Sequence, residues 1–269
     1  MKTSLVALLF ILGMAAGFAQ TDTDSDLPEH TGDNFSLEGA LALFKKSNSL
    51  EDFEKMINEE NNNVNNLDLN NDDETDYIVV QDIQDKDTHV IVLSAYLGEN
   101  DKQDIATIGI EKTGDEEAVL QIEGDTDLYA ENTIVEPTDN TEKGSGHVAQ
   151  TNPALVVVNV WSWSVVRYIY APSYVVWVSP YRWRKYPSYW RPWKPSRYTV
   201  FYTRTAPHRV YYHRTPTRRV VVARRVYAPR RSHSTVIVQN RRGTTVVHKN
   251  KRGKTKVVKT KKRRSNRNN

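Results

Sequence analysis

The chain contains no cysteine, and it contains no acidic residue after Glu142. The absence of cysteine excludes disulfide bonds, thiolate metal sites, cysteine nucleophiles and anchoring through a lipidated cysteine. The sequence also lacks a glycine-rich phosphate loop and an H-E-x-x-H zinc motif. We therefore predict that the protein is not an enzyme, and that its fold is stabilised by packing or by a metal with non-thiolate ligands.

The two halves of the chain carry opposite charge. All 33 acidic residues lie between Asp22 and Glu142, and residues 20–142 contain only six lysines and arginines. Residues 143–269 contain 30 lysines and arginines, so the net charge of +4 conceals formal charges of −27 and +30. This division predicts electrostatic contact, either with an outside partner or between the two halves themselves.

The first 19 residues have the pattern of a secretory signal peptide. Lys2 gives a positive start, residues 5–18 form an apolar run, and small residues end the segment at Ala19. The apolar run has 14 residues, whereas a helix needs about 20 to span a bilayer. We predict cleavage after Ala19 and a location in the periplasm, at the outer-membrane surface or outside the cell.

The acidic half predicts an α+β domain over residues 35–136, preceded by an acidic linker at 20–34. Apolar spacing of three to four residues predicts two helices, one behind Ser36 and one behind Ser49. Beyond Val64 the period falls to two, and the β-branched segments predict an antiparallel meander at residues 77–83, 88–97, 105–112, 118–124 and 133–135. The predicted fold class is two N-terminal helices on this meander, followed by an extended or β-rich basic aromatic region with a disordered C-terminus.

One loop in this domain has the pattern of a calcium site. Residues 68–78 place oxygen-bearing side chains at relative positions 1, 3, 5 and 9, and calcium prefers such alternating oxygen ligands. The loop resembles the strand-leading calcium loop of FG-GAP repeats, and the resemblance implies Asp68, Asn70, Asp72 and Asp76 as side-chain ligands and Glu74 as a carbonyl ligand. Asp73 replaces the usual turn glycine, and Val79 stands where an EF-hand has glutamate. The alternative is an acidic turn without metal.

Residues 137–153 predict a polar linker, and residues 154–197 a segment of different composition. Its first part, residues 155–166, is apolar and β-branched, which favours a buried or self-pairing strand over a membrane span. All six tryptophans follow between Trp161 and Trp193, and prolines at 187, 192 and 195 predict an extended chain. Its candidate contact residues are Trp183, Trp190 and Trp193, and its candidate polyanion ligands are Arg182, Arg184, Lys185, Arg191 and Lys194. Alternatively, the rings pack together or cover the acidic domain.

Residues 198–258 are predicted to form basic β-rich repeats, and residues 259–269 a disordered basic tail. Short β-branched or aromatic runs alternate with basic pairs, and a ten-residue near-repeat begins at Asn240 and again at Asn250. Such a surface suits polyanions, because each neutralised phosphate or sulfate releases counterions. The further candidate ligands are Arg218, Arg219, Arg224, Arg225, Arg241, Arg242, Lys251 and Arg252. No recognition helix, zinc-finger spacing or RNP-like segment indicates specific nucleic-acid recognition.

The chain as a whole is similar to a family of secreted proteins of Gram-negative bacteria that join a small acidic domain to a Trp/Tyr/Arg-rich tail. The resemblance lies in residues 68–80, 110–114, 128–131, 134–137 and 178–195. It implies no activity, and supports only a boundary near residue 137 and an envelope or extracellular location. Our leading hypothesis is a non-enzymatic interaction protein with a calcium-stabilised acidic domain and a basic aromatic tail that binds lipopolysaccharide, acidic polysaccharide or extracellular nucleic acid. The alternative is a structural protein that self-associates by pairing acidic domains with basic tails.

Overall fold

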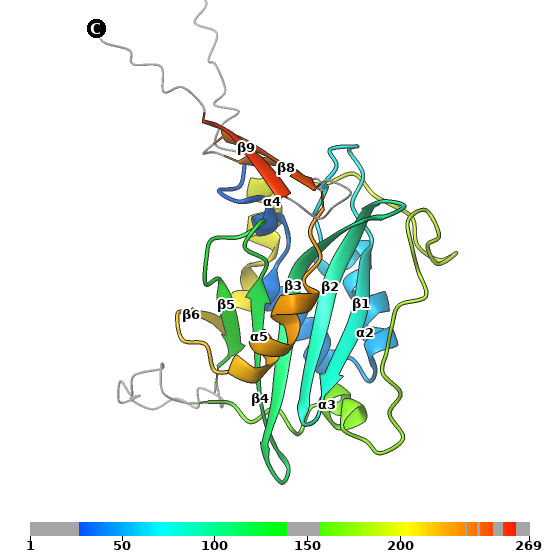
Figure 1. The fold of residues 1–269 in the computed structure, drawn as a ribbon, viewed down its shortest axis with the longest axis vertical. Coiled ribbons are helices and arrows are strands. Elements are labelled where there is room, and N and C mark those ends of the chain that lie inside the picture. The colour runs from blue at the N-terminus through cyan, green and yellow to red at the C-terminus, as the bar shows by residue number, and fades with distance from the viewer. Residues whose placement is uncertain (1–26, 139–156, 235, 241–242, 250–254, 262–269) are drawn as a thin grey trace, which may run out of the picture.

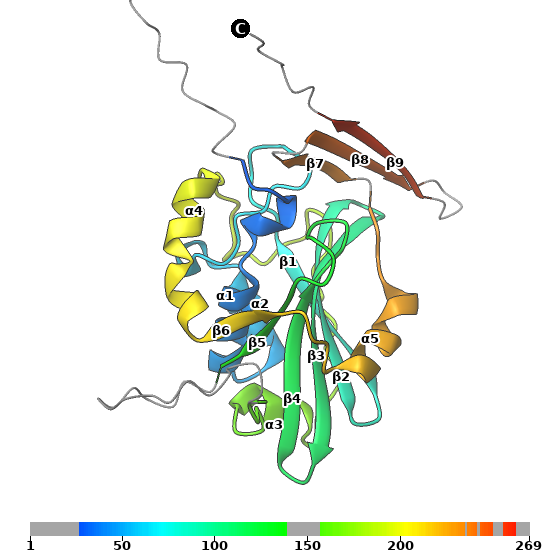
Figure 2. The ribbon, with the colours of Figure 1, turned by 90° about the vertical axis from the view of Figure 1, so that its left-hand side faces the viewer.

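A six-stranded antiparallel sheet with helices on both faces forms the protein (Figures 1 and 2), which confirms the predicted α+β class. The computed structural model describes residues 27–138, 157–234, 236–240, 243–249 and 255–261, so the predicted signal peptide lies outside it. Neighbouring strands follow the order β1-β2-β3-β4-β5-β6. The strands are β1 (Ile78–Asp85), β2 (Thr88–Gly98), β3 (Asp101–Gly114), β4 (Glu117–Gly124), β5 (Ile134–Pro137) and β6 (Tyr212–Thr215).

The first five strands overlap the segments predicted from sequence, and β3 extends beyond its predicted ends at residues 105 and 112. Tight turns connect β1 to β2 and β3 to β4, and Lys86 and Glu116 in these turns have φ of 53° and 56°. The pairing Asp85↔Thr88 closes the first turn, and a register shift after Lys112 precedes the second. Such left-handed residues match the right-handed twist of the strands that they connect.

Helices α1 (Leu37–Lys46) and α2 (Leu50–Ile57) cover one face of the sheet. Each begins at a serine whose hydroxyl accepts a backbone hydrogen bond, from Gly39 to Ser36 at 3.0 Å and from Asp52 to Ser49 at 3.1 Å. Satisfying these amides stabilises a helix start by about 1 kcal/mol. The apolar faces meet at Phe44 and Phe53, whose ring centroids lie 5.2 Å apart in an edge-to-face arrangement.

Helix α3 (Ser164–Ile169) extends the same core, and it corrects one prediction. We expected a strand over residues 155–166, but its described part runs through an irregular segment into this helix. Val165, Val166 and Ile169 are buried. Packing of these side chains against α1 outweighs the β propensity of a valine-rich run.

Helix α5 (Val221–Tyr227) covers the opposite face of the sheet, where we predicted a β-rich segment. The buried residues recur with helical spacing, and they pack on Val90 and Val92 of β2. They are Val220, Ala223, Val226 and Tyr227. Gly109 of β3 allows this close approach, because a Cβ atom there would stand 2.7 Å from that of Ala223.

The basic half also supplies the sixth strand of the sheet. Residues of β6 pair antiparallel with β5, in the register Ile134↔Thr215 to Pro137↔Tyr212. Helix α4 (Tyr198–Arg204) precedes this strand and lies on the opposite side of the sheet from α5 (Figure 2). The segments that we placed after a linker therefore share one sheet with the acidic domain.

The near-repeat forms part of a second, three-stranded antiparallel sheet at one end of the molecule (Figure 1). Its strands are β7 (Val236–Asn240), β8 (Gly243–Lys249) and β9 (Thr255–Lys261). The two copies of the repeat contribute β8 and β9, and their Val-Val pairs face each other in the register Val246↔Val258 and Val247↔Val257. Residues 262–269 of the predicted tail lie outside the described residues.

The end of the predicted acidic linker is packed rather than extended. A short 3-10 helix (Thr31–Asn34) buries Thr31 and Gly32, and the Gly32 amide donates to the Leu128 carbonyl at 2.8 Å. The Gly32 position faces the ring of Tyr129 directly, since a Cβ atom there would stand 2.6 Å from it. A bulky, buried tyrosine elsewhere in the chain thus anchors a segment whose own composition predicts a linker.

Candidate functional site

Arginines of the basic half pair with carboxylates of the acidic half within one chain. Arg218 Nη2 lies 2.6 Å from Glu123 Oε1, and Arg219 Nε lies 3.0 Å from Glu136 Oε2. The carboxylates are largely buried, with side chains 12% and 6% exposed. We predicted both arginines to bind polyanions. The structure shows each of them paired with a carboxylate of the chain and only 28% and 23% exposed, and polyanion binding by these two residues stays a prediction.

The other candidates of the basic repeats differ in their positions. Arg224 is half-buried and lines a small cavity with Asp125 and Arg231, whereas Arg225 is exposed. The remaining four, Arg241, Arg242, Lys251 and Arg252, are candidates whose side chains lie outside the described part of the chain.

The basic aromatic segment presents its cations on the surface. Arg182 and Lys185 close a tight turn, with the Lys185 amide donating to the Arg182 carbonyl at 2.9 Å. Arg184 takes φ of 56° in this turn, and its guanidinium lies 5.4 Å from the ring centroid of Trp183. The five predicted cations are exposed, and none forms an ion pair with a carboxylate of the described residues: Arg182, Arg184, Lys185, Arg191 and Lys194.

The three candidate tryptophans do not share one environment. Trp190 is only 6% exposed, and its ring packs edge-to-face on Tyr77 with centroids 5.1 Å apart. It is therefore a core residue, which corrects its predicted role in ligand contact. Trp183 and Trp193 are half-buried and retain accessible surface. Burial of Trp190 fixes the segment on the domain, so that the neighbouring cations have a defined position.

The predicted calcium loop is curled by its own side chains. The Asp68 carboxylate accepts from the Asp72 and Asp73 amides at 3.1 and 3.0 Å, and Asp72 Oδ1 accepts from the Glu74 amide at 3.0 Å. Asp73, which stands in the glycine position, takes φ of 63°. The chain thus makes the sharp turn that the motif requires without glycine.

Carboxyl groups of this loop influence one another electrostatically. Burial raises the pKa of Asp76 to about 8, and the charges of Asp68 and Asp72 act in the same direction. Burial also raises the pKa of Asp68, with hydrogen bonds from the Asp72 and Asp73 amides acting against it. Among the residues described, no three histidine, cysteine or acidic side chains are gathered closely enough to hold a metal ion. Calcium binding stays a prediction.

The structure brings the acidic loop and the basic aromatic segment together. The amide and hydroxyl of Thr75 both donate to the Trp193 carbonyl, at 2.8 and 2.9 Å. A cavity of about 140 Å³ lies between the two segments, with Asp72 and Asp76 on one side and Trp183 and Arg184 on the other. Two motifs that are more than 100 residues apart in the sequence therefore form one region of the surface.

A buried carboxylate that the sequence did not indicate holds the start of this segment. Glu54 of α2 accepts hydrogen bonds from the Ser179 hydroxyl at 2.6 Å and the Trp177 indole at 3.2 Å. It also accepts from the Val80 amide and the Tyr77 hydroxyl, each at 3.2 Å. Burial nevertheless dominates, and raises the pKa of Glu54 from 4.5 to about 7.

This shift predicts a pH dependence of stability that Glu54→Gln removes. Because the folded-state pKa is above the unfolded value, the folded state holds more protons between about pH 4.5 and 7. The stability contributed by protonated Glu54 is present below pH 4.5 and is lost as the pH rises to about 7, a change of at most about 3 kcal/mol. Urea unfolding across this range should show a flatter profile for Glu54→Gln than for the unchanged protein. Glu51→Gln, on the exposed side of α2, should keep the original slope; equal slopes for all three proteins would contradict the assignment.

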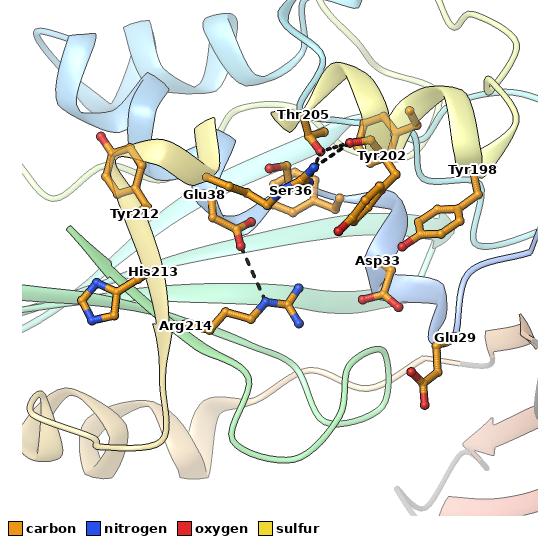
Figure 3. A pocket seen from close by; sticks show the side chains of 13 residues that line it. Glu29, Asp33, Ser36, Glu38, Tyr198, Tyr202, Thr205, Tyr212, His213 and Arg214 are labelled. Atoms are coloured by element: carbon orange, nitrogen blue, oxygen red, sulfur yellow. Dashed lines mark hydrogen bonds and ion pairs between the residues drawn. The ribbon is translucent and has the colours of Figure 1, made fainter. Parts of the chain in front are cut away.

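A separate pocket lies between α4, β6 and the N-terminal segment (Figure 3). It has a volume of about 520 Å³, and Tyr198 and Tyr202 line it together with Asp33. Its charged groups are engaged with protein atoms: Arg214 Nε lies 3.6 Å from Glu38 Oε1, and Arg209 Nη1 donates to Thr205 Oγ1 at 2.7 Å. The residues that line the pocket therefore do not favour a ligand of either charge. The spacing of Tyr198, Phe201 and Tyr202 is the sequence signal that would have predicted α4 and this pocket wall.

No protein-family model, curated protein or solved structure matches the chain. Within the described ranges, no helix is long and apolar enough to cross a membrane. Functional inference therefore depends on the arrangement of residues described above.

Proposed function

We propose that this is a non-enzymatic secreted or cell-envelope interaction protein that binds anionic surfaces or polymers through residues 181–195. The observation that carries the proposal is the division of the basic residues into two groups. Arg218, Arg219 and Arg231 pair with Glu123, Glu136 and Asp125, whereas Arg184 and Lys185 stand exposed on a turn without an ion pair among the described residues. Lipopolysaccharide, acidic polysaccharide and extracellular nucleic acid all offer the anionic groups that such cations bind.

The fixed position of these cations supports the proposal. The aromatic rings of Tyr77, Tyr186 and Trp190 pack together beneath the turn, with the Tyr186 and Trp190 centroids 4.8 Å apart. A rigid base reduces the conformational entropy lost on binding. With a nucleic acid as the partner, the half-buried Trp183 ring would stack on a base, and such stacking does not depend on the base sequence.

The triple variant Arg184→Gln, Lys185→Gln, Lys194→Gln tests this proposal. It should elute from heparin and from DNA columns at lower salt, and the slope of log K against log salt should fall by up to about three, one unit for each lost contact. The matched control changes three exposed basic residues elsewhere, Lys46, Arg204 and Arg230, to glutamine. If both triple variants weaken binding equally, net charge governs retention and residues 181–195 have no special role.

We further propose that calcium binds at residues 68–76 and stabilises this region. The donor set fits, because Asp68, Asn70 and Asp72 place oxygen atoms on alternate residues of a loop that is already curled. A bound cation would reduce the repulsion between these carboxylates and Asp76. It would also support Trp193, whose carbonyl is held by Thr75 within the same loop.

Calcium should therefore raise the unfolding temperature of the protein, and Asp68→Asn with Asp72→Asn should abolish the increase. A ligand at one hundred times its dissociation constant stabilises a folded protein by about 2.7 kcal/mol. Calcium and magnesium titrations monitored by calorimetry would measure the effect. The control variant Asp115→Asn, Glu116→Gln removes two charges from the β3–β4 turn and should retain the calcium response. An undiminished response in the Asp68/Asp72 variant would place any calcium site elsewhere.

A further inference from the structure

The segment between α3 and the basic turn exposes three valines. Val175, Val176 and Val178 are 80%, 42% and 50% exposed. Figure 1 shows this part of the chain leaving α3 and running beside β1, the edge strand of the sheet. A run of exposed apolar side chains indicates an interaction surface more often than a single exposed apolar side chain does.

Val176 and Val178 face outward because the residues between and beyond them are held inward. Trp177 donates its indole N–H to Glu54, and its carbonyl accepts from the Asp82 amide at 2.8 Å. Ser179 donates its hydroxyl to the same carboxylate and its amide to the Val80 carbonyl. The alternation of an extended chain then directs Val176 and Val178 away from the sheet.

Positive charge and aromatic rings flank the valines. Arg167 precedes them, and Arg182, Arg184 and Lys185 follow, all exposed and without an ion pair to a carboxylate in the ranges described. Tyr168 is 43% exposed on the preceding helix. Protein surfaces that bind the interface of an anionic bilayer typically combine exposed apolar residues with neighbouring tyrosine and basic residues.

We propose that Val175, Val176 and Val178 insert into the headgroup region of an anionic lipid bilayer while Arg182, Arg184 and Lys185 contact the lipid phosphates. The inference depends on the proposed function and names the lipid bilayer as the surface. A soluble polyanion would use the cations but gain nothing from the valines. A second copy docked on the same edge would bring the cations of both copies together. Glu51 and Asp52 lie on the α2 side of this segment, beside Trp177 and Tyr181, so the bilayer approaches from the opposite side.

Co-sedimentation of the full chain with lipid vesicles tests the inference. The protein should bind vesicles of phosphatidylglycerol and phosphatidylcholine, and not vesicles of phosphatidylcholine alone. Val175→Ser with Val178→Ser should weaken this binding by at least about tenfold, because it removes apolar area that the bilayer would bury. The same variant should elute from heparin as the unchanged protein does. Val221→Ser with Val222→Ser, two valines that are 50% and 40% exposed on α5, is the matched control and should bind vesicles normally.

Each outcome separates this inference from the proposed function. Retention on heparin without binding to anionic vesicles, or full vesicle binding by the Val175/Val178 variant, overturns the inference and leaves the proposed function intact. If the unchanged protein binds neither heparin nor anionic vesicles, both the inference and the proposed function are overturned. If the Val175/Val178 variant instead converts a dimer into a monomer in sedimentation velocity and binds vesicles normally, the segment is an interface between copies. Unfolding midpoints of both serine variants, measured in urea, establish that they are folded.

Discussion

Replacing Arg231 with leucine is expected to lower the free energy of unfolding by about 3–5 kcal/mol, because it leaves a buried carboxylate without its cation. Arg231 pairs with Asp125, whose side chain is 2% exposed, and its Nη2 atom also lies 3.0 Å from Asp127 Oδ2. Burial raises the pKa of Asp125, and the hydrogen bonds and charge of Arg231 oppose that rise. Urea unfolding at neutral pH would measure the loss.

The adjacent residue provides the control for this prediction. Arg230 is exposed, and its guanidinium donates to the Val226 carbonyl at 2.9 Å. Arg230→Leu should change the free energy of unfolding by less than about 1 kcal/mol. The double variant Arg231→Leu, Asp125→Leu should recover much of the loss, since it removes the buried charge together with its partner. Similar values for Arg231→Leu and Arg230→Leu would show that the pair contributes little.

Ending the chain after Thr138 is expected to abolish cooperative folding altogether. The truncation removes Val165, Val166 and Ile169 from the main core, and it removes α5 from Val90 and Val92 on the other face. It also leaves β5 without its partner β6. Exposed core surface on both faces of a small sheet costs more than the few kcal/mol by which a domain of this size is stable.

A second truncation separates the contribution of the two parts of the basic half. Ending the chain after Ser234 keeps α3, α4, β6 and α5, and retains the hydrogen bond from the Ser234 amide to Gln103 Oε1 at 3.1 Å. This shorter protein should unfold cooperatively in urea, with circular dichroism as the probe. A cooperative transition in the fragment ending at Thr138 would mean that the acidic half folds independently.

The strands of the acidic half were predictable because their signals are local. Alternating β-branched residues and charged turns define β1 to β5, and a serine at each helix start defines α1 and α2. The positions where sequence-based prediction differed are those where distant packing decides. Val220 to Val222 favour a strand by propensity, but burial of Ala223 and Tyr227 against β2 and β3 makes a helix there.

The candidate binding residues show the same limit more sharply. Arg184 and Arg218 both lie in basic stretches that also contain apolar or aromatic residues, so sequence alone gives them equal weight. Their difference arises from Glu123, which lies 95 positions from Arg218 in the sequence. In the same way, nothing local distinguishes the buried Trp190 from the more accessible Trp193. Composition predicted electrostatic contact, either with an outside partner or between the two halves, but only tertiary placement tells which cations remain on the surface.

The position of β6 in the sheet affects how the chain reaches its fold. Pro137 of β5 pairs with Tyr212 of β6, although 75 positions separate them in the sequence. During synthesis, β1 to β5 are therefore complete about 75 residues before Tyr212 is added. At typical rates of 5–20 residues per second, the acidic half waits several seconds with an open strand edge and with the face that α5 will cover still exposed. During this interval, the net negative charge of residues 20–142 makes unfinished chains repel one another, and the basic half later closes the sheet and pairs with part of that charge.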